Sequence, residues 1–250
     1  MEEKVEIFEN ERIDDLELNG LKIIQNKERF CFGIDSILIA NFAKDLKKDS
    51  KVLDLGTGTG IIPTILCGKS KLKKVVGIEI QKEVCEMANR SIEMNKLSDK
   101  FNIICDSILN LNKYYKKQEF DVVISNPPYK KINTGIVNDN DFKMISRHEV
   151  TASLEDFIKS GSDMLKDKGE FYMVHHPERL VDIFYYMRKY KVEPKNVRFV
   201  VSMLGEMPKL VLIKAVKNGK PFLKVEKELN IYKERDIYSD EIIKMYKGDK

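Results

Sequence analysis

Residues 51–60 read KVLDLGTGTG, an apolar run that leads directly into three alternating glycines. A helical pattern opens at Ile61, so the stretch predicts a buried strand, a tight turn and a helix. Because glycine has no Cβ, the backbone at Gly56, Gly58 and Gly60 can approach a ligand closely. A plain strand-to-helix turn is the alternative reading. A triphosphate-binding P-loop is disfavoured, since no Lys-Ser or Lys-Thr follows the glycines.

The same alternation of strand and helix continues beyond this stretch. Four runs share the apolar character, and the first three are each followed by enough chain for a helix: 51–55, 74–80, 101–105 and 120–125. Continuously apolar strands that alternate with helices indicate a parallel sheet covered on both faces. Later segments add three strands at 170–175, 197–203 and 210–216, and helices at 34–46, 154–165, 178–190 and 240–246. We therefore expect an α/β fold with a mostly parallel, seven-stranded sheet.

The chain divides into three parts that we expect to form one domain, 1–250. An N-terminal extension covers 1–49, a core covers 50–217, and a C-terminal elaboration covers 218–250. In the extension, Asn19-Gly20 supplies the two positive-φ positions of a type I′ turn, which predicts a hairpin over 16–25 before the first helix.

Composition sets outer limits on function. Lys and Arg number 44 against 40 Asp and Glu, and this net charge of +4 permits a nucleic-acid partner without requiring one. The four cysteines form no CxxC pair, which argues against a zinc finger and for a reducing compartment. An acidic start and the lack of a long apolar run exclude a secretory signal and a membrane span. We expect a cytoplasmic monomer that binds no metal.

Acidic residues follow three successive strands of the expected sheet. Asp54 precedes the glycines, Glu79 ends the second strand, and Asp106 follows the third. In a parallel sheet, ligands bind beyond the carboxyl ends of the strands, where an acid such as Glu79 is suited to accept bonds from ribose hydroxyls. Asp106 then lies where an adenine amino group would lie. NAD could also use the first two acids.

The fourth strand ends in Asn126-Pro127-Pro128-Tyr129, the residue set needed to methylate a planar amino nitrogen. The Asn126 side-chain oxygen and the Pro127 carbonyl can accept both N–H bonds, which lets the nitrogen lone pair turn toward a methyl donor. Two prolines hold these acceptors rigid, and Tyr129 offers a ring on which a base can stack. The alternative is a Pro-Pro turn with an Asn cap.

In this order, DLGTGTG, IEI, CDS and NPPY resemble the Rossmann-like class I methyltransferases that transfer a methyl group from S-adenosylmethionine to amino nitrogens. The resemblance implies helices on both faces of the sheet and a cofactor site. It assigns catalysis to residues 126–129. It assigns cofactor contacts to Asp54, Gly56, Gly58, Gly60, Glu79, Asp106 and Asn126. Asp35 precedes the first strand of the sheet, so we expect it either to contact the methionine end of the cofactor or to cap the helix that begins there.

The flanking segments narrow the resemblance. Residues 11–43, 146–157, 174–180 and the C-terminal part look like bacterial enzymes that methylate N6 of adenine 37 in valine tRNA, except that His176 stands where an Arg is expected. This implies a tRNA substrate, with Lys130, Lys131 and Arg147 as candidate RNA contacts. The alternatives are a glutamine N5-methyltransferase acting on release factors, which usually carries a larger helical N-terminal domain, and an idle cofactor- or RNA-binding module.

Overall fold

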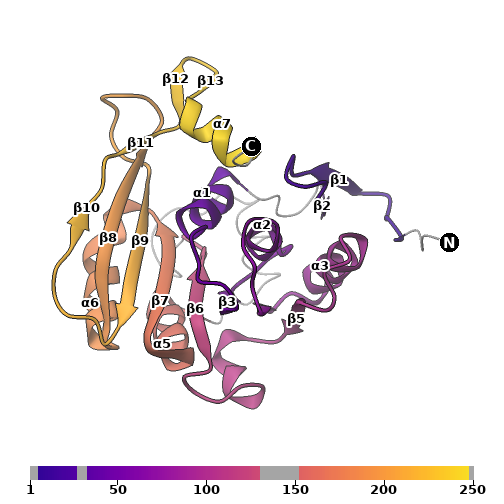
Figure 1. The fold of residues 1–250 in the computed structure, drawn as a ribbon, viewed down its shortest axis with the longest axis horizontal. Helices are drawn as coiled ribbons and strands as arrows, with labels where there is room; N and C mark the ends of the chain where they lie inside the picture. Colours follow the sequence, from indigo (N-terminus) through magenta and orange to yellow (C-terminus); the bar gives the residue numbers. More distant parts are fainter. Residues whose placement is uncertain (1–4, 27–32, 130–151, 248–250) are drawn as a thin grey trace, which may run out of the picture.

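The computed structural model describes residues 5–26, 33–129 and 152–247 (Figure 1). A central sheet runs through these residues with helices packed on both sides. The strands are β1 (Glu11–Asp15), β2 (Lys22–Asn26), β3 (Lys51–Leu55), β4 (Lys74–Glu79), β5 (Phe101–Cys105), β6 (Phe120–Ser125), β7 (Leu165–His175), β8 (Val192–Val201), β9 (Leu210–Lys217), β10 (Lys224–Val225), β11 (Leu229–Asn230), β12 (Tyr232–Glu234) and β13 (Ile237–Tyr238). The helices are α1 (Ile34–Phe42), α2 (Ile61–Lys69), α3 (Lys82–Met94), α5 (Leu154–Met164), α6 (Leu180–Lys189) and α7 (Asp240–Lys247), with 3-10 turns η1 (Ile108–Lys113) and η2 (Pro177–Arg179).

The sheet has the strand order β10-β8-β9-β7-β6-β3-β4-β5, and β11 also pairs with β8. Strands β3 to β7 are parallel to one another, whereas β9 is antiparallel to both β7 and β8. The seven predicted strands are therefore confirmed as β3 to β9. The sequence did not predict β10 and β11, because each is only two residues long.

Two apolar layers form because successive side chains of a strand point to opposite faces. On β3, Val52 packs in the layer that contains α1 and α2, whereas Leu53 packs in the layer that contains α5 and α6. Asp54 alternates back to the first face and is fully buried there. The predicted coverage of both faces is confirmed, and the strand places a carboxylate inside the molecule at its carboxyl end.

The N-terminal hairpin differs from its prediction in register. Asn19 and Gly20 do adopt positive φ (51° and 72°), but the first strand is Glu11–Asp15, so the predicted strand at 16–18 is wrong. Leu16 and Leu18 are instead buried in the loop, and the Asn19 amide donates to the Gly68 carbonyl of α2 at 2.9 Å. Burial against α2 outweighs the alternating pattern that suggested a strand.

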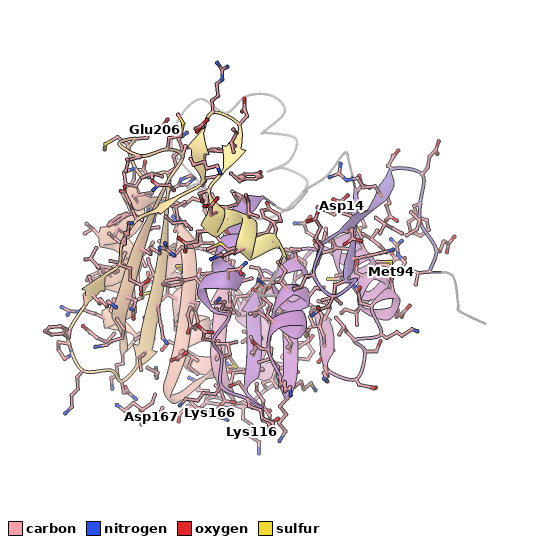
Figure 2. The ribbon with its side chains drawn as sticks, turned by 45° about the horizontal axis from the view of Figure 1, so that its top comes forward. Asp14, Met94, Lys116, Lys166, Asp167 and Glu206 are labelled. Atoms are coloured by element: carbon pink, nitrogen blue, oxygen red, sulfur yellow. The ribbon has the colours of Figure 1, made fainter. Side chains whose placement is uncertain are left out.

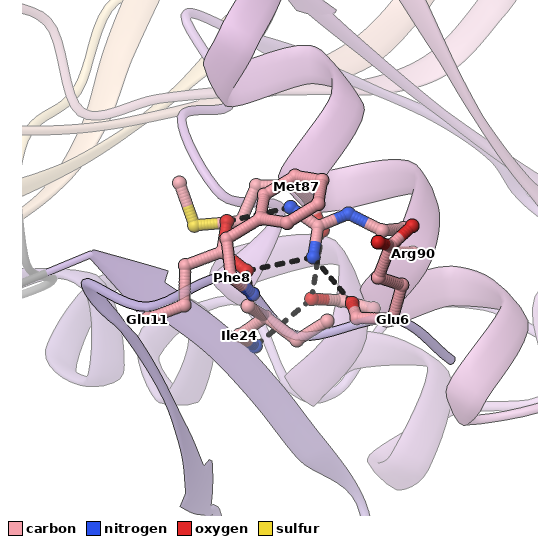
Figure 3. Close-up of polar contacts among 7 residues, drawn as sticks. Glu6, Phe8, Glu11, Ile24, Met87 and Arg90 are labelled. Carbon is pink, nitrogen blue, oxygen red and sulfur yellow. Dashed lines mark hydrogen bonds and ion pairs between the residues drawn. The ribbon is translucent and has the colours of Figure 1, made fainter. Parts of the chain in front are cut away.

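Arg90 of α3 anchors the segment that precedes this hairpin (Figure 3). Its guanidinium donates to both carboxylate oxygens of Glu11 (2.6 and 2.7 Å) and to the Glu6 carbonyl (2.6 Å). The same group lies 4.3 Å from the centre of the Phe8 ring. The ion pair lowers the pKa of Glu11 and raises that of Arg90. The N-terminal segment is thus held to the helix that follows β4.

Different loops lie at the two ends of the strands, which are the amino and carboxyl ends of the parallel strands (Figure 2). Glu206, in the connection from β8 to β9, lies at one end of the molecule. Lys166 and Asp167, at the start of β7, lie at the other end. Strand β8 runs in the direction of β7, because both are antiparallel to β9. The β8–β9 connection therefore belongs to the edge where the parallel strands end, which is the edge that carries the candidate site.

Candidate active site

The glycine loop forms a left-handed path between β3 and α2. Gly56, Gly58 and Gly60 have φ values of 70°, 56° and 81°, a region that strains any residue with a Cβ. Gly60 is also the N-cap of α2. The backbone itself therefore requires these three glycines, and their N–H groups donate within the protein, to the Ile78 carbonyl, the Glu79 Oε2 and the Thr57 carbonyl respectively.

Buried polar atoms without partners gather beside this loop. Among the described residues, both carboxylate oxygens of Asp54 and the hydroxyls of Thr57 and Thr59 accept or donate no hydrogen bond. Burial raises the pKa of Asp54 to about 7, the nearby Thr57 hydroxyl partly opposes this, and the charge of Glu79 adds to it. Buried polar atoms are normally satisfied, so these groups fit a site that is completed by a polar ligand.

Glu79 lies at the end of β4, as predicted, and it organises the loop. Its Oε2 accepts the Gly58 N–H at 3.0 Å, and its Oε1 accepts the N–H groups of Ile80 and Gln81, each at 3.0 Å. A carboxylate has about four acceptor positions, so one remains on Oε2. Glu79 therefore ties the glycine loop to β4 and keeps one acceptor position for a hydroxyl group.

Asp106 follows β5 directly. It comes one residue after Cys105, which pairs with Glu79 of β4. Its Oδ1 accepts from the Ser107 N–H and the Asn110 amide (2.6 and 2.7 Å), and its Oδ2 accepts from the Tyr114 hydroxyl at 2.8 Å. The Asn110 and Tyr114 bonds are the main reason that the pKa of Asp106 is lowered. The carboxylate is ionised and fixed in direction, with an acceptor position left on Oδ2.

The Asn126–Tyr129 loop leaves β6 beside the glycine loop, because Ser125 pairs with Leu55 and the next residue lies level with Gly56. The Asn126 amide donates to the Ser36 hydroxyl at 3.3 Å. The Tyr129 hydroxyl lies 2.7 Å from the Asn126 Oδ1 and 2.8 Å from an Asp35 carboxylate oxygen.

A single O–H hydrogen cannot serve both of these acceptors, so Asp35 and Asn126 compete for it. Gly33, rather than Asp35, is the N-cap of α1, and the Asp35 side chain instead reaches Tyr129 of the Asn126–Tyr129 loop.

Two histidines at the end of β7 surround the Tyr129 ring. The ring centres of His175 and His176 lie 5.1 and 4.4 Å from that of Tyr129, both edge-on. Burial lowers the pKa of His175 to about 4, so its ring is neutral, and it accepts the His176 N–H at 2.7 Å. Burial and the charge of Asp35 raise the pKa of Tyr129, which keeps its hydroxyl protonated. Tyr129 is therefore a neutral ring held in place by two imidazoles.

The structure thus brings together the Asn126–Tyr129 loop, Asp35 and the glycine loop at the carboxyl ends of β3 and β6, with Glu79 and Asp106 at the ends of the next two strands. Pro127 is buried and Pro128 is exposed. Lys130, Lys131 and Arg147 lie outside the described residues. The partners that the sequence did not indicate are Thr57, Thr59 and Tyr114. Thr57 and Thr59 lie in the loop that follows β3, whereas Tyr114 follows η1, nine residues beyond the end of β5.

The described residues also bear on metal binding and on membrane insertion. Within residues 5–26, 33–129 and 152–247, no cluster of three or more His, Cys, Asp or Glu side chains could hold a metal ion. The helices of the same ranges include none with the length and apolarity needed to span a bilayer.

A parallel sheet with a left-handed glycine loop, acids at successive strand ends and an Asn-Pro-Pro-Tyr turn defines the class of Rossmann-like methyltransferases. The sequence pattern of the family "Methyltransferase small domain" matches residues 32–201, which is more than half of the chain. The chain belongs to this family, and it is an enzyme of the methyltransferase class.

Individual relatives agree with this assignment. A protein of Porphyromonas gingivalis named tRNA1(Val) (adenine(37)-N6)-methyltransferase is 29% identical over 185 residues, which cover 72% of each chain. Among solved structures, a predicted O-methyltransferase from Agrobacterium tumefaciens superposes with a TM-score of 0.68 at 18% identity, over 86% of this chain and 96% of that one.

A geranyl diphosphate C-methyltransferase from Streptomyces coelicolor, solved with S-adenosyl-L-homocysteine, superposes with a TM-score of 0.54 at 12% identity, over 74% and 78% of the two chains. At such identities these structures establish the fold.

Proposed function

We propose that this protein transfers a methyl group from S-adenosylmethionine to the N6 amine of an adenine in tRNA, with adenine 37 of a valine tRNA as the target. The observation that carries the proposal is the Asn126–Tyr129 loop, which stands level with the glycine loop and is bonded to Asp35. The printed name of the Porphyromonas gingivalis relative supports the choice of nucleotide.

The cofactor site that we propose uses the unpaired groups beside the glycine loop. Asp54, Thr57 and Thr59 offer buried polar atoms without partners, and Glu79 keeps one acceptor position on Oε2. Asp106 keeps one acceptor position toward the adenine side. When bound, S-adenosylmethionine would supply a methyl group on a sulfonium: the nitrogen lone pair would bond to the methyl carbon as the carbon–sulfur bond breaks, the sulfur would leave as a neutral thioether, and the nitrogen would lose one proton to water. These residues bind the donor and fix its direction.

The tetrapeptide orients the acceptor amine. An exocyclic amine is a weak nucleophile, since its lone pair is delocalised into the ring. The Asn126 oxygen and the Pro127 carbonyl accept its two N–H bonds, so the lone pair is released toward the methyl group. Fixed proline φ angles keep both acceptors in place before the reaction. The Tyr129 ring, held by His175 and His176, provides a flat apolar surface for the base.

The target base must leave its stack to reach these groups. Single-stranded RNA loops allow this, because their bases are free to turn outward. Lys130, Lys131 and Arg147 remain proposed contacts for the RNA backbone. Phosphate contacts of this kind predict a steep fall in affinity with rising salt.

The test is direct methyl transfer. The protein is incubated with labelled S-adenosylmethionine and total bacterial tRNA, and the labelled nucleoside is mapped by mass spectrometry. N6-methyladenosine at position 37 of a valine tRNA is the expected product. A release factor whose target glutamine is unmethylated serves as the competing substrate. Label on the protein and none on tRNA would refute the proposed substrate.

A further inference from the structure

The connection between β8 and β9, residues 202–209, projects from the same edge as the catalytic tetrapeptide. The register shows this: Ser125 pairs with Met173, His175 pairs with Val211, and Val211 pairs with Phe199. The connection begins three residues after Phe199, so it rises beyond the level of the tetrapeptide. Neighbouring strands lie about 4.8 Å apart, and β9 is two strands from β6, which places the base of the connection about 10 Å from the site.

The tip of this connection is apolar and exposed. Leu204 and Met207 have 81% and 84% of their surface accessible, and Met203 has 36%. Single exposed apolar residues are normal on a protein surface, but three within five residues at a site edge form a contact surface. The tip is also internally braced, since the Glu206 N–H donates to the Met203 carbonyl at 3.1 Å and Gly205 adopts a φ of 85°.

His176 joins this connection to the catalytic tetrapeptide. Its Nδ1 lies 3.0 Å from the Lys209 carbonyl, and a carbonyl only accepts, so Nδ1 carries the hydrogen. On its other side, the same ring contacts Tyr129. The Lys209 N–H in turn donates to the Val200 carbonyl at 2.9 Å, which fixes the base of the connection. Surface and site are therefore continuous through one side chain.

We infer that Met203, Leu204 and Met207 form the surface on which unpaired bases next to the target adenine pack. The inference rests on the proposed function. A base that turns outward exposes the faces of its neighbours, and apolar or aromatic side chains are the groups on which such faces pack. Thioether side chains suit this role because they are flexible and polarisable.

The charge pattern favours bases over phosphates at this place. Lys209 lies 4.0 Å from Glu206, and on the adjacent β12–β13 hairpin Lys233 pairs with Asp240 and Arg235 lies beside Asp236. Each of these three cations has an anion beside it, so the described residues of the connection and the hairpin create no net positive field that would mark a backbone path. An apolar tip with a neutral rim fits the uncharged faces of nucleobases.

The test compares two double variants in tRNA methylation. Leu204→Ala with Met207→Ala removes the tip. Phe222→Ala with Val225→Ala is the matched control, because these side chains are 83% and 63% exposed but lie away from the connection: Phe222 precedes β10, and Val225 pairs with Val197 in the middle of β8. Base packing of about 1–3 kcal/mol predicts a KM for tRNA about five- to 150-fold higher for the tip variant. Its kcat, its affinity for S-adenosylmethionine and its melting temperature should stay at wild-type values, as should every value of the control.

A conservative variant separates loss of the surface from loss of shape. Leu204→Phe with Met207→Leu keeps the tip apolar and should hold the KM for tRNA within about twofold of wild type. A wild-type KM in the alanine variant, an equal rise in the control, or a fall in kcat with KM unchanged would overturn the inference. Absence of tRNA methylation by the wild-type protein would instead remove the proposed function.

Discussion

Replacing Asp54 by Asn should make the ligand-free protein more stable at neutral and alkaline pH. Asp54 is fully buried without a hydrogen-bond partner, and its pKa is raised from 3.8 to about 7. Below pH 3.8 the carboxyl group is neutral in the folded and unfolded chains, so its ionisation does not change the free energy of unfolding. Between these two values only the unfolded chain ionises, so stability falls as the pH rises.

The size of the effect follows from the shift. One pKa unit corresponds to 1.36 kcal/mol, so a difference of about three units destabilises the wild type by about 4 kcal/mol at pH 8. At pH 5 the same relation gives a destabilisation of the wild type of less than about 2 kcal/mol. Asn has nearly the shape of the carboxyl group and does not ionise, so the variant escapes this cost.

The assay is urea unfolding of both proteins at pH 5, 6, 7 and 8 without cofactor. The gain in unfolding free energy for Asp54→Asn should grow over this range and level off near pH 8. Asp106→Asn is the control of opposite sign, because hydrogen bonds lower the pKa of Asp106 and its charged form is the stabilised one. An Asp54→Asn variant that is less stable, or whose gain does not vary with pH, would refute the reasoning.

Further substitutions test the site and the anchor of the N-terminal segment. Asn126→Ala should lower turnover about a hundred- to a thousandfold with cofactor affinity retained, and Asn126→Asp should keep more activity; near-normal turnover in the Ala variant would exclude Asn126 from the reaction. Glu79→Ala should weaken S-adenosylmethionine binding about ten- to a hundredfold in calorimetry, and unchanged affinity would contradict its assignment. Arg90→Ala should cost about 2 kcal/mol in unfolding free energy, whereas Arg12→Ala, in an exposed pair with Asp14, should cost less than about 1 kcal/mol.

Much of the fold was predictable because its strands are buried on both faces. The runs that became β3, β4, β5 and β6 are mostly apolar and β-branched, with one or two polar residues in each, so they can be recognised as strands without knowing their neighbours in the sheet. The hairpin was predictable in its turn and not in its register. Leu16 and Leu18 alternate as a strand would, and only the packing of the loop against α2 shows why they are buried outside one.

The positions of the site residues were predictable for a related reason. Parallel strands end at one edge, so Asp54, Glu79, Asp106 and Asn126 had to converge. Their hydrogen-bond partners were not predictable. That the Gly58 N–H would occupy Glu79, or that Tyr114 would occupy Asp106, depends on the turn that each chain segment makes after its strand, and no spacing in the sequence encodes that turn.

The competition for the Tyr129 hydroxyl gives Asp35 a part in the proposed reaction. An Asn126 oxygen that accepts from Tyr129 has one lone pair fewer for an amine. The Asp35 carboxylate is the stronger acceptor because it is charged, so the hydroxyl can turn to it when the amine arrives. The ring stays in place meanwhile, since the imidazoles of His175 and His176 hold it independently of the hydroxyl. In the proposed reaction we therefore expect Asp35 to act through Tyr129 and to free the Asn126 oxygen, the acceptor on which the orientation of the target nitrogen depends.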